Sequence, residues 1–492
     1  NNNYQQTALL TTLYNFSNNS KLFLKNFYLK SKRAVDKPKN EGPAGYVFPG
    51  DDPRPGNQAE LLRTLQVQGC EIHRATAPFT VTFKGKKKPS SPAPSESPSP
   101  TGSPSPAATP SGAVPRVSPT PSPLPSPTPA PSPKLEAEQR TFPAGSYIVR
   151  MDQPYSRIAD ALLDYQYWAP NDPQQDVYDD TGWTMGELGN VKVVRVTDVK
   201  ALSASMERVN GDVRAPALVS GGGSVYLVNH NADNALVTLR YRLKDVAFEA
   251  AEEPFEAGGK KFNRGSFIIR KADLSQLRQA ATELGLQVTV VESAPTVKTH
   301  PVRAPRIAVM HTWLSTQDEG WWRLALDQLG VPFSYISTQD AAKDPDLRRK
   351  YDVIIFAPVG RGASAIIGGL PMWGNPIPWK TTPLTPNIGK IDSTDDIRPG
   401  LGFSGLMNLQ KFTQEGGLFI GSMDTADLAV TAGFTPGLSI TRSQRLKAIG
   451  AVLRSKVVDT ASPISYGYDD SLAIYCFNGP IFNVSNFARG GG

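Results

Sequence analysis

The chain of 492 residues contains few of the residues that build metal centres, disulfide frameworks and membrane spans. Its two cysteines, Cys70 and Cys476, are too far apart for a zinc knuckle and too few for a disulfide framework, which predicts two buried free thiols. Only four histidines occur, with neither an HxxE nor an HExxH motif. No apolar run reaches the ~18 residues that cross a bilayer. We therefore expect no metal site, no cofactor and no membrane span in this chain.

The charge is mildly basic, with 52 Lys and Arg against 45 Asp and Glu. No basic stripe interleaved with aromatic residues accompanies it, so nucleic acid is not an expected partner. The sequence begins with Asn1 and shows no signal peptide, which suggests a fragment or a processed product. Low cysteine content fits the cytoplasm and the bacterial periplasm equally well.

Proline, in contrast, is abundant in one place. Of the 44 prolines, 17 lie in the 45 residues from Pro89 to Pro133, together with 12 serines. Such a tract has few side chains to bury and few backbone donors, so we expect a disordered, extended Pro/Ser loop over residues 86–139. Hydrophobic content of 39% over the whole chain is enough for sizeable cores elsewhere.

The expected fold class is α/β, in three parts. Residues 8–37 carry apolar side chains at helical spacing, which predicts one or two amphipathic helices within a helical connector (residues 1–40) from a missing upstream domain. Residues 41–298 read as a duplicated strand–helix–strand–strand–helix unit. The unit has strands at 45–49 and 70–82 and helices at 59–67 and 156–164, and in its second copy strands at 226–229 and 246–250 and helices at 232–243 and 274–284.

The clearest sign of duplication is a matched pair of segments, residues 144–150 (AGSYIVR) and 264–270 (RGSFIIR), each preceded by a Pro-Phe dipeptide. The second copy joins the two with Gly258-Gly259-Lys260-Lys261, a hairpin turn signal. The first copy carries the Pro/Ser tract at the same place. The tract is therefore predicted to be an enlarged hairpin tip and not a boundary between domains.

The third part, residues 305–485, alternates apolar strands (306–311, 333–336, 351–358 and 418–421) with helices (319–329, 409–415 and 425–432). This pattern predicts a doubly wound parallel sheet, with residues 360–402 as a long loop over the strand ends. In such sheets ligands bind at the carboxyl ends of the strands. The first strand–helix turn places His311, Trp313, Glu319, Trp322 and Arg323 there, which suggests a polar groove for a ligand or partner. The alternative is tryptophans packed against the long loop and a hydrogen-bonded His311.

Three further positions have weaker claims to chemistry. The run His230-Asn231-Ala232-Asp233 has the wrong acid for a zinc motif and reads as a strand-end histidine followed by an N-cap aspartate. Gly421-Ser422-Met423-Asp424 stands where a nucleophile elbow would follow a strand, without a cysteine or a second glycine. Ser422 is thus either a nucleophile or a helix cap. Asp179-Asp180 either binds a cation or caps a turn. We assign no catalytic or metal-binding residue.

Several stretches have no generic explanation: residues 159–170 (ADALLDYQYWAP), 178–184 (YDDTGWT), 311–323 (HTWLSTQDEGWWR) and 465–480 (SYGYDDSLAIYCFNGP). Through these stretches, residues 20–480 resemble the downstream half of large bacterial secreted zinc carboxypeptidases of the carboxypeptidase A-like family. The resemblance implies that the third part is a glutamine-amidotransferase-like domain without its catalytic cysteine. No position here matches the family's zinc ligands or its catalytic glutamate and arginine.

The resemblance implies an accessory, non-catalytic C-terminal region of a periplasmic or secreted metallocarboxypeptidase-like protein. Zinc and proteolysis would belong to the upstream domain, the chain's expected partner, with a peptide or protein substrate also possible. The alternatives are an independent ligand- or peptide-binding module that uses the 311–323 groove, and an unrecognised hydrolase that uses Ser422.

Overall fold

A computed structural model describes residues 2–83, 138–165, 184–270, 273–441, 451–476 and 480–485. It is a mixed α/β protein with several sheets, one of them four-stranded and all-parallel. The predicted Pro/Ser loop lies outside the described residues except for its end, because Glu138 and Gln139 already belong to a strand. The Asp179-Asp180 pair and most of the 178–184 stretch also lie outside them.

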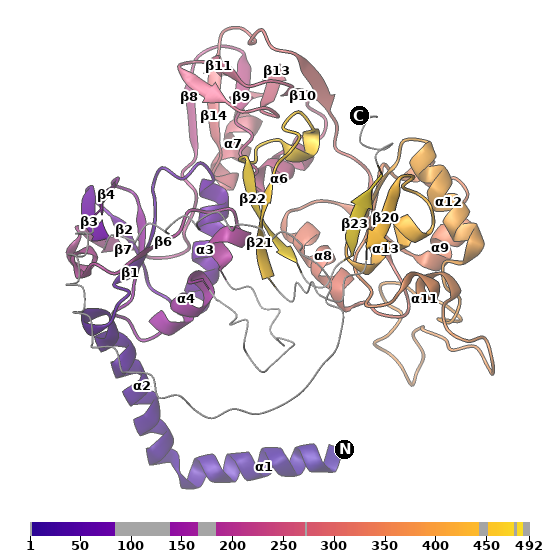
Figure 1. The fold of residues 1–492 in the computed structure, drawn as a ribbon, viewed down its shortest axis with the longest axis horizontal. Helices are drawn as coiled ribbons and strands as arrows, with labels where there is room; N and C mark the ends of the chain where they lie inside the picture. The colour runs from indigo at the N-terminus through magenta and orange to yellow at the C-terminus, as the bar shows by residue number, and fades with distance from the viewer. Residues whose placement is uncertain are drawn as a thin grey trace, which may run out of the picture.

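Two helices begin the chain, as the apolar spacing predicts: α1 (Asn2–Asn18) and α2 (Ser20–Asn40). They project from the body of the molecule (Figure 1). No residue of α1 is buried, and Ala34 and Pro38 are the buried residues of α2.

The first sheet has the strand order β6-β1-β5-β2-β7, and each neighbouring pair of strands is antiparallel. Side chains alternate across it. Tyr46 and Phe48 of β1 face the helices α3 and α4, whereas Val47 faces the β3–β4 hairpin on the other side. The elements are β1 (Gly45–Phe48), α3 (Pro55–Val67), β2 (Ile72–Ala75), β3 (Phe79–Phe83), β4 (Glu138–Phe142), β5 (Tyr147–Arg150), α4 (Ser156–Leu163), α5 (Met185–Leu188), β6 (Val194–Val196), the 3₁₀ turn η1 (Val199–Ser203) and β7 (Met206–Arg208).

The second sheet has the order β15-β10-β13-β9-β14-β8, antiparallel except for the β14–β8 pair. Helices α6 and α7 cover one face and the β11–β12 hairpin the other. The elements are β8 (Leu218–Gly221), β9 (Val225–Val228), α6 (Ala235–Arg242), β10 (Phe248–Ala251), β11 (Phe255–Ala257), β12 (Lys260–Phe262), β13 (Phe267–Arg270), α7 (Leu274–Leu284), β14 (Gln287–Val291) and β15 (Thr299–Val302).

The two sheets share a pairing pattern. Three strands of the first sheet, β1, β2 and β5, correspond to β9, β10 and β13 of the second. In each set the strand that comes last in the chain lies between the other two, β5 between β1 and β2 and β13 between β9 and β10. The registers also match, since Val149 opposes Tyr46 and Ile72, and Ile269 opposes Tyr226 and Phe248. Both central strands follow a Gly-Ser pair whose glycine, Gly145 or Gly265, has a φ near +87°. Only glycine adopts this conformation without strain.

Each pattern includes a hairpin. In the second, Gly258 and Gly259 both have positive φ and form the two-residue turn that the sequence predicts. In the first, Phe79 pairs with Phe142 and Phe83 with Glu138, so the strands on either side of residues 84–137 are paired. The prediction of a single strand over residues 70–82 is wrong. It is divided into β2 and β3 at Thr76–Pro78, where Pro78 has no N–H to donate to a ladder.

The parallel sheet has the order β17-β16-β18-β19, that is, second, first, third and fourth in chain order. Helix α12 begins seven residues earlier than predicted, since tertiary packing overrides the low helix propensity of Gly402 and Gly405. The elements are β16 (Ile307–His311), α8 (Gln317–Gln328), β17 (Phe333–Ser337), α9 (Thr338–Lys343), α10 (Leu347–Lys350), β18 (Val353–Phe356), α11 (Ala363–Gly368), α12 (Gly402–Gln414), β19 (Leu418–Gly421) and α13 (Asp424–Thr431).

The C-terminal part forms two two-stranded ladders that the sequence does not predict, β20–β23 beside the parallel sheet and β21–β22 near the centre of the view, below the second sheet (Figure 1). The segment before β22 contacts the parts of the chain that hold the first two sheets. Tyr466 packs against Gly265, which precedes β13 of the second sheet. Asp469 pairs at 3.0 Å with the buried Arg54, which precedes α3 beside the first sheet. The strands are β20 (Leu438–Thr441), β21 (Ala451–Lys456), β22 (Ser471–Cys476) and β23 (Ile481–Val484), with the 3₁₀ turn η2 (Pro463–Ser465).

Candidate functional site

A cavity of about 460 Å³ lies where β16 ends and α8 begins, between these elements and the loop that follows α11. Strand β17 contributes Tyr335 to the wall. The lining residues are His311, Trp313, Leu314, Ser315, Thr316, Glu319, Arg323, Tyr335, Trp379, Asn387, Ile388, Gly389, Lys390, Ile391, Asp392 and Ile397. The size is within the range of small-molecule sites, about 300–1,000 Å³.

One wall of the cavity is a stack of rings and a guanidinium group. His311 lies parallel to Tyr335, with ring centroids 4.2 Å apart, and edge-on to Trp313 at 4.9 Å. Arg323 places its guanidinium carbon 4.4 Å from the centre of the Tyr335 ring. Stacking and cation–π contacts of this kind fix the orientation of each member. The wall is therefore preorganised before any ligand arrives.

Glu319 is the buried acid of this wall, with 2% of its surface exposed. One carboxylate oxygen, Oε1, accepts a hydrogen bond of 2.6 Å from the Tyr335 hydroxyl and lies 3.7 Å from Arg323 Nη1. Glu319 and Arg323 meet because they are four residues apart on α8. Burial, followed by the Glu319 contact, raises the pKa of Tyr335 well above its usual value, so the phenol stays protonated and keeps donating.

His311 is held from both sides and is almost completely buried. Its Nε2 lies 2.7 Å from Asp392 Oδ2, and its Nδ1 lies 3.3 Å from the Thr312 carbonyl oxygen. Both ring nitrogens therefore have protein oxygens as partners. The role that this geometry allows is to hold the Asp392 loop against the cavity.

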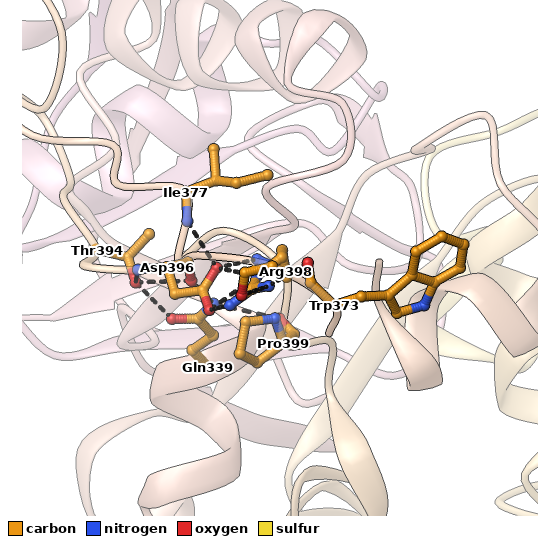
Figure 2. Close-up of polar contacts among 8 residues, drawn as sticks. Gln339, Trp373, Ile377, Thr394, Asp396, Arg398 and Pro399 are labelled. Carbon is orange, nitrogen blue, oxygen red and sulfur yellow. Dashed lines mark hydrogen bonds and ion pairs between the residues drawn. The ribbon is translucent and has the colours of Figure 1, made fainter. Parts of the chain in front are cut away.

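The loop over the cavity is anchored by a second polar cluster (Figure 2). Arg398 is 4% exposed, binds both oxygens of Asp396 at 2.7 and 2.8 Å, and donates to the Trp373 carbonyl at 3.0 Å. Gln339 of α9 donates to the Asp396 carbonyl at 2.8 Å and accepts from Thr394 at 2.8 Å. Arg398 also holds the pKa of Asp396 well below its usual range. The cluster fixes both ends of the loop that carries Trp379 and Asp392.

The structure brings together four of the five residues predicted for the groove: His311, Trp313, Glu319 and Arg323. Trp322 is partly buried but is not among the lining residues. On α8 it is next to Arg323, and residues one apart on a helix point in different directions. Tyr335 and Asp392 are lining residues that the sequence interpretation missed. The available signal for Asp392 was its place in the long loop over the strand ends.

The suspected elbow after β19 has the shape of a nucleophile elbow but not its chemistry. Its apex is Met423, with φ 55° and ψ −121°, a conformation that is strained for a side chain with a Cβ. Ser422 precedes the apex, and its N–H donates to Thr425 Oγ1 at 2.9 Å. The Asp424 carboxylate accepts from the N–H groups of Val359 at 3.0 Å and Arg361 at 3.2 Å. These amides, on the turn after β18, are thus already occupied.

His230 sits at a strand end, as predicted, and its backbone N–H donates to Ser266 Oγ at 3.0 Å. Burial lowers the pKa of His230 and favours the neutral ring. Asp233 accepts from the Ala235 N–H at 3.0 Å, but the N-cap of α6 is Asn234 and not Asp233 as predicted, because the helix begins one residue later than such a cap requires. Within the described part of the chain, no three His, Cys, Asp or Glu side chains lie close enough to hold a metal ion.

Comparison of the chain with models of known protein families, with curated proteins and with solved structures found no match. In the described residues, no helix is long and apolar enough to cross a membrane.

Proposed function

We propose that the parallel-sheet domain is a binding module that takes a small ligand in the cavity beside His311. The observation that carries the proposal is the cavity itself, about 460 Å³ at the carboxyl end of β16, with a wall in which His311 and Arg323 are held against the Tyr335 ring. A ligand that enters the cavity meets side chains that are already oriented, so little conformational freedom is lost on binding.

Binding fits this geometry better than catalysis does. A general base needs a free acceptor within reach of the proton it removes, and both nitrogens of His311 are engaged. A hydrolase at the elbow would need a nucleophile at the apex and free amides for the oxyanion. There the apex is Met423, and the Asp424 carboxylate occupies the amides of the neighbouring turn.

For the whole chain we propose the accessory, non-catalytic region of a periplasmic or secreted zinc metallocarboxypeptidase-like protein. The support is the resemblance of four sequence stretches to that family. The second-first-third-fourth strand order and the elbow conformation of Met423 support an amidotransferase-like domain within it. The matching registers of the first two sheets support the tandem duplication.

A thermal-shift screen tests the binding module. We would expose the full chain to a library of amino acids, peptides, sugars, nucleosides and organic acids. We expect at least one class to raise the melting temperature by mass action. The increase should disappear in Glu319→Gln, which removes the buried charge that holds Tyr335 and Arg323 in the cavity wall. Asp327→Asn, on an exposed position of the same helix, is the control and should keep the full shift.

The proposal fails if no class changes the melting temperature. It also fails if the shift survives in Glu319→Gln to the same extent as in Asp327→Asn.

A further inference from the structure

We infer that a second cavity of the chain binds an anion that carries phosphate groups. This cavity, of about 610 Å³, lies between the end of α6, which covers the second sheet, and the amino ends of β16 and β17 in the parallel sheet. It shares no lining residue with the His311 cavity, which is at the opposite edge of the same sheet. The inference is therefore independent of the proposed function.

The lining of this cavity is strongly basic. Its charged residues are five cations and one acid: Arg240, Lys244, Arg303, Arg306, Lys350 and Asp245. Two of the cations have acids outside the lining, since Arg306 pairs with Asp352 at 2.9 Å and Lys350 with Asp344 at 2.7 Å. Asp352 is itself shared with a further cation, Arg348, at 2.6 Å. An excess of positive charge therefore remains after these neighbouring pairs are included.

Three of the cations, Arg240, Lys244 and Arg303, form no ion pair with any carboxylate in the part of the chain that the structure describes. Arg240 is buried, and its guanidinium donates to the carbonyl oxygens of Val302 at 3.0 Å, Leu243 at 2.7 Å and Lys244 at 3.0 Å. Burial lowers the pKa of Arg240, as expected for a charge that has left water without a counter-ion. Lys244 and Arg303 are exposed and can turn toward a ligand.

Hydrogen bonds hold the two sides of the cavity together. The Tyr241 hydroxyl of α6 donates at 2.8 Å to the carbonyl oxygen of Pro305, which precedes β16. Three residues earlier on the same helix, the Thr238 hydroxyl donates at 2.8 Å to the carbonyl oxygen of Leu329, at the end of α8. The positive charges therefore belong to segments that are fixed relative to one another, so a bound anion finds them already assembled.

A phosphate-bearing anion fits this set of charges better than a single carboxylate does. A phosphate group carries about 1.5 to 2 negative charges at pH 7 and accepts several charge-assisted hydrogen bonds from guanidinium and ammonium groups. Its charges sit on one compact group, whereas the carboxylates of an acidic peptide are spread along a chain. A basic cavity between low-dielectric walls concentrates its field on such a group.

Calorimetric titration of the full chain tests the inference. The probes are inorganic phosphate, pyrophosphate and tripolyphosphate at an ionic strength held constant with sodium chloride. We expect affinity to rise with the charge of the probe and to fall as the salt concentration is raised. The double variant Lys244→Gln/Arg303→Gln removes the two exposed cations and should weaken pyrophosphate binding by at least about tenfold.

A matched control separates the cavity from general surface charge. Lys260→Gln/Arg278→Gln removes two exposed cations elsewhere in the second-sheet region, on β12 and α7, and should keep the affinity of the original protein. Equal weakening in the two double variants would overturn the inference, because the anion would then respond to net charge alone. Absence of binding by all three probes would also overturn it.

Two further arms identify the ligand and the site. A penta-glutamate peptide that binds more tightly than tripolyphosphate, and loses affinity in Lys244→Gln/Arg303→Gln, would overturn phosphate as the ligand class and indicate an acidic protein segment. Glu319→Gln, in the His311 cavity, should leave pyrophosphate binding unchanged. Loss of pyrophosphate binding in this variant would overturn the placement of the anion site, whereas the proposed function depends only on the ligands whose thermal shift requires Glu319.

Discussion

One buried carboxylate joins the first two sheets, and a single methyl group should disrupt it. Asp233 is 6% exposed and accepts from Ala235 at the start of α6 and from the Gly56 N–H, at 2.8 Å, in the first turn of α3. It therefore accepts hydrogen bonds from the first turns of helices on both sheets. A Cβ added at Gly56 would overlap with both oxygens of this carboxylate. The perturbation is Gly56→Ala.

Two opposing effects set the size of the change. Alanine stabilises a helix by about 1 kcal/mol relative to glycine. Displacing Asp233 removes hydrogen bonds to a charged group, worth about 1.5–3 kcal/mol each. If both bonds are lost, the net destabilisation is about 2–5 kcal/mol. The matched control is Gly320→Ala on α8, where a Cβ meets nothing within 4 Å and the helix should gain up to about 1 kcal/mol.

Calorimetry of both variants, with amide exchange of α3 and α6, measures the effect. We expect a lower melting temperature and faster exchange in the first turns of both helices in Gly56→Ala, and neither change in Gly320→Ala. In a double-mutant cycle, Asp233→Ala should cost much less in the Gly56→Ala background than in the original protein, because its bonds are already broken. Equal stabilisation by the two glycine substitutions would show that the carboxylate does not join the sheets.

Two further predictions concern titratable groups. Burial raises the pKa of the Cys70 thiol to about 11, so at pH 8 only about one Cys70 thiol in a thousand is ionised. Iodoacetamide should therefore alkylate the half-buried Cys476 before the buried Cys70. Equal labelling rates of the two cysteines, measured by mass spectrometry, would contradict this prediction. Hydrogen bonds from Arg306, which has the larger effect, and from Arg348 lower the pKa of the Asp352 carboxylate. The stability that these bonds contribute is therefore fully present above the ordinary pKa of aspartate near 3.8, and it is lost as the pH falls through the lower pKa of Asp352 in the folded protein. Asp352→Asn should therefore destabilise the protein at pH 7 in denaturant titrations, with a difference from the original protein that narrows below pH 4; a constant difference would contradict the assignment.

Local patterns predicted the local structure well. Helix α7 (Leu274–Leu284) and strand β19 (Leu418–Gly421) have the expected bounds, because apolar periodicity and flanking glycines act over a few residues. Strand β15 (Thr299–Val302) was missed because it is short and contains Pro301. It exists through its pairing with β10, and such a pairing across many residues leaves no periodic signal in the strand itself.

The candidate site also contains residues that a local pattern predicts and residues that only long-range packing brings together. His311, Trp313, Glu319 and Arg323 lie within one strand–helix turn, so a single rule about strand ends brought them together. Asp392 follows His311 by 81 residues and reaches it through a loop whose path depends on the Arg398 cluster. No local pattern encodes that path. Tyr335 was available as a strand residue, but its contact with Glu319 depends on the pairing of β16 with β17.

The carboxyl edge of the parallel sheet holds two turns with opposite properties, and the contrast favours the His311 cavity as the binding site. At the elbow, Asp424 supplies its own carboxylate to the Val359 and Arg361 amides, so an incoming anion would have to displace a group that is already in place. At the His311 cavity, about 460 Å³ of space lies beside a wall that is held by contacts among His311, Tyr335, Glu319 and Arg323. A ligand at this edge therefore fits beside His311 more readily than at the elbow.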